Sequence, residues 1–342
     1  MMGKDLPAKN LLNCPDVFAD ITNVNLFDGE DLLQPEELSV MPTELVYKDN
    51  YGTMRHHYLD TRMKAEEHQT DIAVFCIENQ SGVSNIMPVR DMGYLYSNYS
   101  EQIREVQRKD GKKKEFPVTE GIDRDQKLIP VISLVLYYGQ EPWNGPEKLS
   151  DLLSVPEDWQ EKLEPLITDH PVRIIHLAAQ DEETRAKYKS DFRHIADYLA
   201  CAGDREESWQ YISDESREIC HPEEYLDMMA AFSNDARFAR IKATVLSKRN
   251  EGEGRVTMFS IVDELENIGR QKGVKEGMEK GASEKSRKII CTMLRDEQSP
   301  ELISKYTEEP VEYVYQVKQE MLQYAKEEAG YHAGGKKAEQ ES

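Results

Sequence analysis

The sequence has no long hydrophobic run. None of its windows approaches the roughly 18 apolar residues that a membrane span needs, and the opening residues MMGKDLPAKN lack the apolar centre of a signal peptide. We therefore expect a cytoplasmic protein that does not enter a membrane.

Cysteine is scarce and scattered. The five cysteines are odd in number, lie far apart and form no C-x-x-C pair. This excludes a disulfide framework and a zinc ribbon, and reduced thiols suit a cytosolic protein. The sequence also lacks a P-loop, the glycine pattern of a Rossmann fold and a G-x-S-x-G motif, so the enzyme classes built on them are not indicated.

Positive charge is also in short supply. Lysine and arginine number 43 against 65 aspartates and glutamates, a formal net charge of -22. Because phosphate binding draws its strength from clustered cations, this balance excludes broad wrapping of nucleic acid. Any contact with DNA has to be local, and the one dense basic stretch, residues 107–114, contains Lys112, Lys113 and Lys114.

The first 200 residues contain an alternation of helix and strand patterns. A length of 342 residues predicts one large domain and a smaller appendage. Apolar periodicity predicts helices over residues 9–31, 87–103 and 181–202, and strands over residues 43–49, 54–63, 70–78, 128–139 and 172–178. This order predicts an α/β protein with a mixed sheet flanked by helices.

Strand patterns disappear after Gly203, and an all-helical C-terminal extension is expected. We place the α/β domain in residues 1–203, and divide the rest into a helical region (204–268), a charged, glycine-punctuated linker helix (269–288), a helix-turn-helix-like element (289–328) and a disordered tail (329–342).

The glycines of the linker helix recur every four residues on one face, at 273, 277 and 281. A weakly ordered hinge and a packed partner helix both remain open, with the hinge favoured.

The last predicted helix, residues 310–324, carries Lys318 as its only cation against Glu312 and Glu320. That composition is poor for a helix that reads a phosphate-flanked groove. This composition argues against the hypothesis of a helix-turn-helix regulator. It favours a homodimer contact or a partner-protein contact in the helical C-terminal region.

Two carboxylates stand at the ends of predicted strands. Side chains alternate along a strand, so Glu78 and Gln80 share a face, and Asp60 shares a face with Arg62 on the preceding strand. If these strands pair, Asp60 and Glu78 converge. Two close carboxylates in a partly buried site repel each other, and a hard divalent cation such as Mg²⁺ relieves that repulsion. Acidic strand ends are more often simply solvated, which is the plainer interpretation.

Four segments in order carry a resemblance to a known family: FADITNVNLFDGE, TELVYKDNYGTMRHHYLD, IENQSGVSNIMPVRDMGYLYSNYSEQI and VLYYGQEPWNGPEKLSDLL. Over roughly residues 10–200, the chain resembles the Rpn family of recombination-promoting nucleases, also labelled transposases. That family is similar to the PD-(D/E)xK nuclease superfamily, so the resemblance implies a restriction-endonuclease-like fold.

The resemblance also implies a metal site. Asp60 and Glu78 take the metal-binding positions, and the backbone carbonyl of Asn79 is a third ligand. Gln80 takes the position of the usual catalytic lysine, which is a departure from the superfamily pattern because glutamine brings no positive charge. An acid from the first helix often completes such sites; Asp20 is the candidate, with Asp16 and Glu44 as rivals.

On this basis we expect a Mg²⁺-dependent DNA endonuclease, with Mn²⁺ as a substitute metal, linked to recombination or mobile elements. Arg90 and Lys112 to Lys114 are the candidate DNA contacts, and Tyr94 and Tyr99 are expected to serve helix packing. The alternative is a catalytically silent module that binds DNA or protein on a nuclease fold, which the strong acidity and the missing lysine favour.

Overall fold

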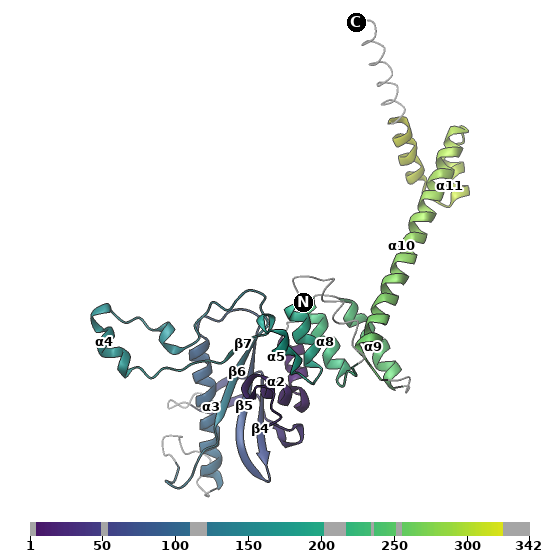
Figure 1. The fold of residues 1–342 in the computed structure, drawn as a ribbon. Helices are drawn as coiled ribbons and strands as arrows, with labels where there is room; N and C mark the ends of the chain where they lie inside the picture. The colour runs from purple at the N-terminus through teal and green to yellow at the C-terminus, as the bar shows by residue number, and fades with distance from the viewer. Residues whose placement is uncertain are drawn as a thin grey trace. The chain divides into compact units, whose positions relative to one another are not determined.

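The computed structural model describes residues 5–48, 54–109, 122–201, 217–233, 236–250 and 255–323. The chain divides into two compact units, Met1–Leu265 and Glu266–Ser342 (Figure 1). Within the described ranges, no helix is both long enough and apolar enough to cross a membrane.

Unit 1 is built on a mixed five-stranded sheet. The strands are β1 (Leu38–Val40), β4 (Thr61–Glu67), β5 (Thr70–Gln80), β6 (Val131–Tyr137) and β7 (Ile174–His176), and they lie in that order across the sheet. The first two pairings are antiparallel and the last two are parallel. The mixed α/β architecture predicted from the sequence is therefore confirmed.

The central strand β5 is covered on both faces. Its residues from 73 to 79 are all buried, which is why this segment is a nearly continuous apolar run. On one face, Phe75 packs edge-to-face against Phe27 of helix α2 (Pro15–Phe27) with ring centroids 6.3 Å apart. On the other, Val74 and Cys76 share a buried cluster with Tyr94 of helix α3 (Met87–Lys109). Helices α2 and α3 thus flank the sheet (Figure 1).

The expected strand 54–63 is two strands rather than one. Strand β3 (Met54–Tyr58) pairs with β2 (Glu44–Lys48) in a separate two-stranded sheet, and β4 begins the larger sheet at Thr61. At the junction, the N–H of Leu59 donates to the carbonyl of Thr43, and the Leu59 side chain is buried. Asp60 therefore lies at a break between strands, and the strand alternation used to orient its side chain does not apply.

Two expected helices are also interrupted. The predicted helix 9–31 is split into α1 (Asp5–Leu12) and α2, because Pro15 opens a new helix. Helix α2 ends at the Asp28–Gly29 turn, where both residues have positive φ values of 55° and 87°. The predicted helix 181–202 consists of α5 (Glu182–Ala186) and α6 (Phe192–Ala200).

The remaining elements of unit 1 are short or helical. Single turns are η1 (Pro35–Glu37), η3 (Leu149–Leu152), η4 (Glu157–Trp159), α4 (Gln160–Leu163), η5 (Glu164–Leu166) and η6 (Leu177–Ala179). Helices α8 (Pro222–Ser233) and α9 (Ala236–Asn250) follow, and α10 (Met258–Arg295) begins here. His221, just before α8, lies 2.8 Å from the carboxylate of Asp16 at the start of α2.

Unit 2 contains a small helical core. The end of α10, helix α11 (Pro300–Thr307) and a helix over residues 311–323 bury Ile290, Ile303, Val314 and Val317 together. Ser299 caps α11, because its hydroxyl accepts the N–H of Leu302. The predicted tail, residues 329–342, lies outside the described residues.

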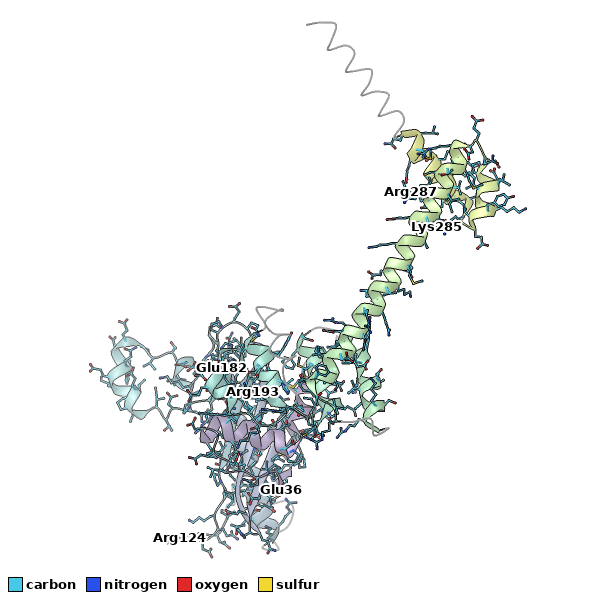
Figure 2. The ribbon with its side chains drawn as sticks, turned by 45° about the vertical axis from the view of Figure 1, so that its right-hand side comes forward. Glu36, Arg124, Glu182, Arg193, Lys285 and Arg287 are labelled. Atoms are coloured by element: carbon cyan, nitrogen blue, oxygen red, sulfur yellow. The ribbon has the colours of Figure 1, made fainter. Side chains whose placement is uncertain are left out.

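Between these parts, α10 is continuous through the predicted linker. Every residue from 269 to 285 is exposed, and side chains project along this stretch (Figure 2). Each of its four glycines costs about 1 kcal/mol in helix propensity relative to alanine. The ion pairs Lys272–Glu276 and Lys275–Glu279 return only about 0.5 kcal/mol each. Local interactions therefore do not account for the stability of this stretch.

Candidate active site

The structure brings Asp60 and Glu78 to the same end of the neighbouring strands β4 and β5. The antiparallel register of β4 and β5 sets Thr61 opposite Ile77, so Asp60 and Glu78 are the next residues beyond that pair. The Oδ2 atom of Asp60 accepts the backbone N–H of Asn79 at 2.7 Å. The predicted convergence thus holds, although the strand break rather than strand alternation positions Asp60.

Glu78 is a buried carboxyl group with perturbed acidity. It is 6% exposed, and burial raises its pKa to about 7, with the neighbouring charge of Asp60 as the second cause. Both effects disfavour the ionised carboxylate. A cation at this point would remove the penalty, which is the electrostatic property expected of a metal ligand.

Three side chains donate to the same oxygen of Glu78. Gln80 Nε2 lies 2.9 Å from Glu78 Oε1, and the hydroxyl of Tyr94 lies 3.2 Å from it. The guanidinium of Arg90 forms an ion pair with the same atom and also donates to the Tyr94 hydroxyl at 2.9 Å. In this state Arg90 supplies the positive charge that partly offsets burial of Glu78.

Helix α3 presents Arg90 and Tyr94 to the strand from one face. They are four residues apart, which places them one above the other on a helix. Tyr94, expected to serve helix packing, also donates its hydroxyl to Glu78, a contact that was not predicted. The four-residue spacing from Arg90 was the available signal. Arg90 itself, predicted as a DNA contact, is engaged with Glu78 here.

Asn79 points to the opposite face, as strand alternation predicts. Its Oδ1 atom accepts the hydroxyl of Tyr138 at 2.8 Å. Its Nδ2 atom is buried without a hydrogen-bond partner among the described residues. The role of its backbone carbonyl as a metal ligand stays a prediction.

The candidate acids of the N-terminal region have other partners. Asp20, buried on α2, accepts the N–H groups of Lys189 and Ser190 and the hydroxyl of Ser190, at 2.6 to 3.1 Å. These bonds hold the turn that separates α5 from α6. Asp16 pairs with His221, and Glu44 accepts the hydroxyl of Tyr58. Their hydrogen bonds therefore anchor other elements, and a metal-binding role for Asp20 stays a prediction.

A buried arginine anchors the strand that follows Asp60. Arg62 is 0% exposed, and its Nη1 atom donates to Asn98 at 2.8 Å and to Glu101 at 2.7 Å, both on α3. Its Nε atom donates to the carbonyl of Pro42. These bonds fix β4 to α3, the two elements that bring Asp60 and Arg90 toward Glu78. Sequence reasoning did not assign this role to Arg62.

The donor set fits one class of cation. Within the described ranges, no three Asp, Glu, His or Cys residues converge in a way that could hold a metal. A zinc site or a calcium cage needs more protein ligands than this. Mg²⁺ is commonly held by one or two carboxylates and keeps several waters. The Asp60 and Glu78 pair fits that type of ion.

The other predicted DNA contacts cannot be placed. Lys112, Lys113 and Lys114 lie outside the described residues. The described part of the flanking region includes the end of α3, with Arg108 and Lys109 in its last turn.

Comparison with known proteins identifies a family for the domain that carries this site. Residues 30–195 match the family model described as "Putative transposase, YhgA-like". The match covers just under half of the chain. It contains Asp60, Glu78, Gln80 and Arg90, and it relates the chain to mobile-element functions. No curated protein and no solved structure matches the chain.

Proposed function

We propose that the chain is a metal-dependent DNA endonuclease that hydrolyses phosphodiester bonds in recombination or mobile-element processes. In this proposal the mixed sheet is a PD-(D/E)xK fold. Asp60 and Glu78 hold Mg²⁺, or Mn²⁺ as a substitute, together with the backbone carbonyl of Asn79. The match of residues 30–195 to a transposase-like family model supports a DNA substrate.

One observation carries the proposal more than any other. A glutamate is buried beside an aspartate, and its pKa is raised to about 7. Burying a carboxyl group next to a second one lowers the stability of the folded chain, and a bound cation would offset that loss. A binding module for DNA gains nothing from two carboxylates beside a phosphate, because they repel it unless a cation intervenes.

When bound, the metal would neutralise phosphate charge and lower the pKa of a coordinated water. Gln80 lies within hydrogen-bond reach of Glu78 and can orient that water or a phosphate oxygen, although it brings no charge. Arg90 can release Glu78 to the metal and donate to a phosphate, for which its planar guanidinium is suited. The Tyr94 hydroxyl contacts both Arg90 and Glu78, so Tyr94 can keep both side chains in position when Arg90 leaves Glu78.

The decisive experiment is cleavage of supercoiled plasmid in Mg²⁺, Mn²⁺ or EDTA by the parent chain and by Asp60→Asn and Glu78→Gln. Nicked or linear product is expected only with metal, and each variant should lower the rate by at least about 100-fold. Glu67→Gln is the matched control, because Glu67 is an exposed acid at the other end of β4.

Thermal unfolding of each variant should accompany the assay, so that loss of activity is separated from loss of fold. Equal cleavage by the parent and Glu78→Gln would refute the proposed site.

A second candidate function is a catalytically silent module that binds DNA or protein. The ion pair between Arg90 and Glu78 favours this candidate, because Arg90 already neutralises the carboxylate that would bind a metal. Gln80 also stands where the superfamily has a lysine. A parent chain that binds DNA and binds no Mn²⁺ would support this candidate.

A further inference from the structure

Tyr138 contacts the end of strand β5 from two directions. Its hydroxyl donates to the Asn79 Oδ1 atom at 2.8 Å, and its backbone N–H donates to the carbonyl of Gln80 at 2.9 Å. Tyr138 directly follows β6, and the parallel register of β5 and β6 sets Asn79 opposite Leu136. One residue therefore holds both the Asn79 side chain and the backbone of the next residue.

The backbone of Asn79 is in turn joined to the candidate site. Its N–H donates to Asp60 Oδ2 at 2.7 Å, and Glu78 and Gln80 are its neighbours in the chain. The Asn79 side chain is buried, and its Nδ2 atom has no hydrogen-bond partner among the described residues. A buried amide that loses a hydrogen bond carries the cost of desolvation without compensation. The bond from Tyr138 therefore limits where this amide, and the backbone that carries it, can lie.

Helix α8 supports the ring of Tyr138. The ring is buried and packs against the ring of Phe232, with centroids 4.6 Å apart and planes inclined by 47°. Phe232 belongs to α8, which lies outside residues 30–195, the segment that matches the family model. The contact thus connects the end of β5 to a helix that the family match does not include.

We propose that Tyr138 is a positioning residue for the metal centre, and that Phe232 supports it from α8. This inference rests on the proposed function, in which the carbonyl of Asn79 is a metal ligand. Tyr138 acts through Asn79, because its hydrogen bond restricts rotation of the backbone that carries both this carbonyl and the N–H bonded to Asp60. Residues that orient metal ligands through hydrogen bonds typically contribute about 10- to 100-fold to metal affinity.

A packing role alone for Tyr138 makes a different prediction. Buried tyrosines usually find a hydrogen-bond partner, and Tyr188 is a second example in unit 1. It is buried, its hydroxyl donates to Gln180, and it accepts the side-chain amide of Asn25. Loss of either hydroxyl should lower the free energy of unfolding by about 1 kcal/mol. Of the two hydroxyls, that of Tyr138 is the one bonded to Asn79, so Tyr188→Phe is the matched control.

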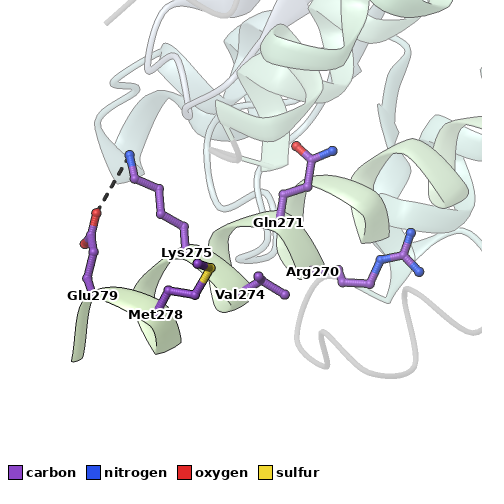
Figure 3. Close-up of a pocket in the computed structure, with 6 residues that line it drawn as sticks. All are labelled: Arg270, Gln271, Val274, Lys275, Met278 and Glu279. Carbon is purple, nitrogen blue, oxygen red and sulfur yellow. Dashed lines mark ion pairs between the residues drawn. The ribbon is translucent and has the colours of Figure 1, made fainter. Parts of the chain in front are cut away.

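The test is Mn²⁺ binding to the full-length chain at pH 8.5 without DNA, followed by the electron paramagnetic resonance signal of free Mn²⁺. Tyr138→Phe should weaken binding at least about tenfold, and Tyr188→Phe should leave it unchanged. Glu279→Gln removes an exposed acid that pairs with Lys275 on α10 (Figure 3). It measures Mn²⁺ held by the acidic surface and should also bind as the parent does. Urea unfolding shows whether each variant folds.

Action through Asn79 is tested by a double-mutant cycle. Asn79→Ala keeps the backbone carbonyl and removes the amide that Tyr138 contacts, so it should weaken Mn²⁺ binding as much as Tyr138→Phe does. Adding Tyr138→Phe to Asn79→Ala should cause no further loss. Phe232→Leu should weaken binding by a smaller factor, because the hydroxyl remains and only the support of its ring is reduced.

The possible outcomes separate this inference from the proposed function. Unchanged Mn²⁺ binding by Tyr138→Phe, in a parent chain that binds Mn²⁺ and cleaves plasmid, would overturn the inference alone. Equal weakening by Tyr188→Phe, or additive losses in the double variant, would also overturn it alone. Weaker binding by Tyr138→Phe, in a parent chain that binds Mn²⁺ and cleaves no plasmid, would support the positioning role and refute the nuclease. A parent chain that binds no Mn²⁺ would overturn both.

Discussion

Glu78 carries the largest electrostatic penalty of the candidate site, and its folded pKa of about 7 lies above the ordinary value near 4.5. Below pH 4.5 both the folded and unfolded states are protonated at this residue. As pH rises from 4.5 to 7 the unfolded state ionises first, so this group makes the folded state progressively less stable. The same penalty makes Glu78 receptive to a cation.

The first prediction concerns that pH range in metal-free buffer with EDTA. The free energy of unfolding of the parent chain should fall relative to Glu78→Gln by up to about 3 kcal/mol between pH 4.5 and 7.5. Urea unfolding at several pH values measures the difference. A difference that stays constant over this range would contradict the burial argument, and Glu67→Gln should show no such trend.

The second prediction separates two roles of Arg90. Arg90→Gln removes both the ion pair with Glu78 and the proposed phosphate contact, so plasmid cleavage should fall about 100-fold. At pH 8.5, where Glu78 is ionised, Mn²⁺ binding without DNA should not weaken, because a competitor for the carboxylate is gone. Arg124→Gln, at an exposed position outside the site and outside the basic stretch 107–114, is the control. Weaker Mn²⁺ binding by Arg90→Gln would show that Arg90 only supports the structure.

At the scale of elements, the loop that joins β4 and β5 has a conformation that its sequence does not predict. Strand pairing runs to Glu67 and Thr70, and the two loop residues between them, His68 and Gln69, both have positive φ, 50° and 65°. A two-residue loop of this kind favours asparagine and glycine. His-Gln is not a turn signal, and tertiary pairing imposes a conformation that these residues adopt at a cost.

The third prediction follows from that strain. Replacing His68 and Gln69 by Asn and Gly should stabilise the chain by about 1 kcal/mol, because the new residues adopt positive φ more readily. His68 is almost fully exposed, with its side chain 90% accessible, so little contact is lost. Thermal unfolding measures the gain, and replacement of both residues by alanine should give none. A loss of stability with Asn-Gly would show that the loop side chains matter.

The sequence predicted the sheet class, the buried strand β5 and the helix after it, because each depends on local periodicity. It also predicted that Asp60 and Glu78 converge, but by a strand alternation that does not hold at Asp60. It did not predict the break at Asp60, which arises where the chain passes from one sheet to another. It also missed the interruption between α5 and α6, because that turn is held by Asp20 from 169 residues away. Contacts of this range leave no periodic signal.

At the scale of the molecule, the two compact units divide within α10. The candidate site and all strands among the described residues belong to unit 1, and the small helical core around Ile290 and Ile303 belongs to unit 2. Catalysis is thus assigned to unit 1 alone.

The fourth prediction tests that division. A chain that ends at Ile268 keeps the buried residues Ile261 and Leu265 of α10 and should retain cooperative unfolding and metal-dependent nicking within about threefold of the parent rate per chain. Urea unfolding and plasmid assays of the same preparation measure both properties. Loss of unfolding cooperativity would show that unit 1 needs the second unit to fold.

Because Asp60 and Glu78 lie on either side of one hairpin, the candidate site is closed by a short loop. The bond between Asp60 and Asn79 spans only 19 residues, whereas the pairing of Val74 with Val131 in β5 and β6 encloses the whole of α3 and the segment after it. Loop-closure entropy grows with the logarithm of loop length. Bringing the two acids together therefore costs less loop-closure entropy than pairing β5 with β6. The two acids can meet before the sheet is complete.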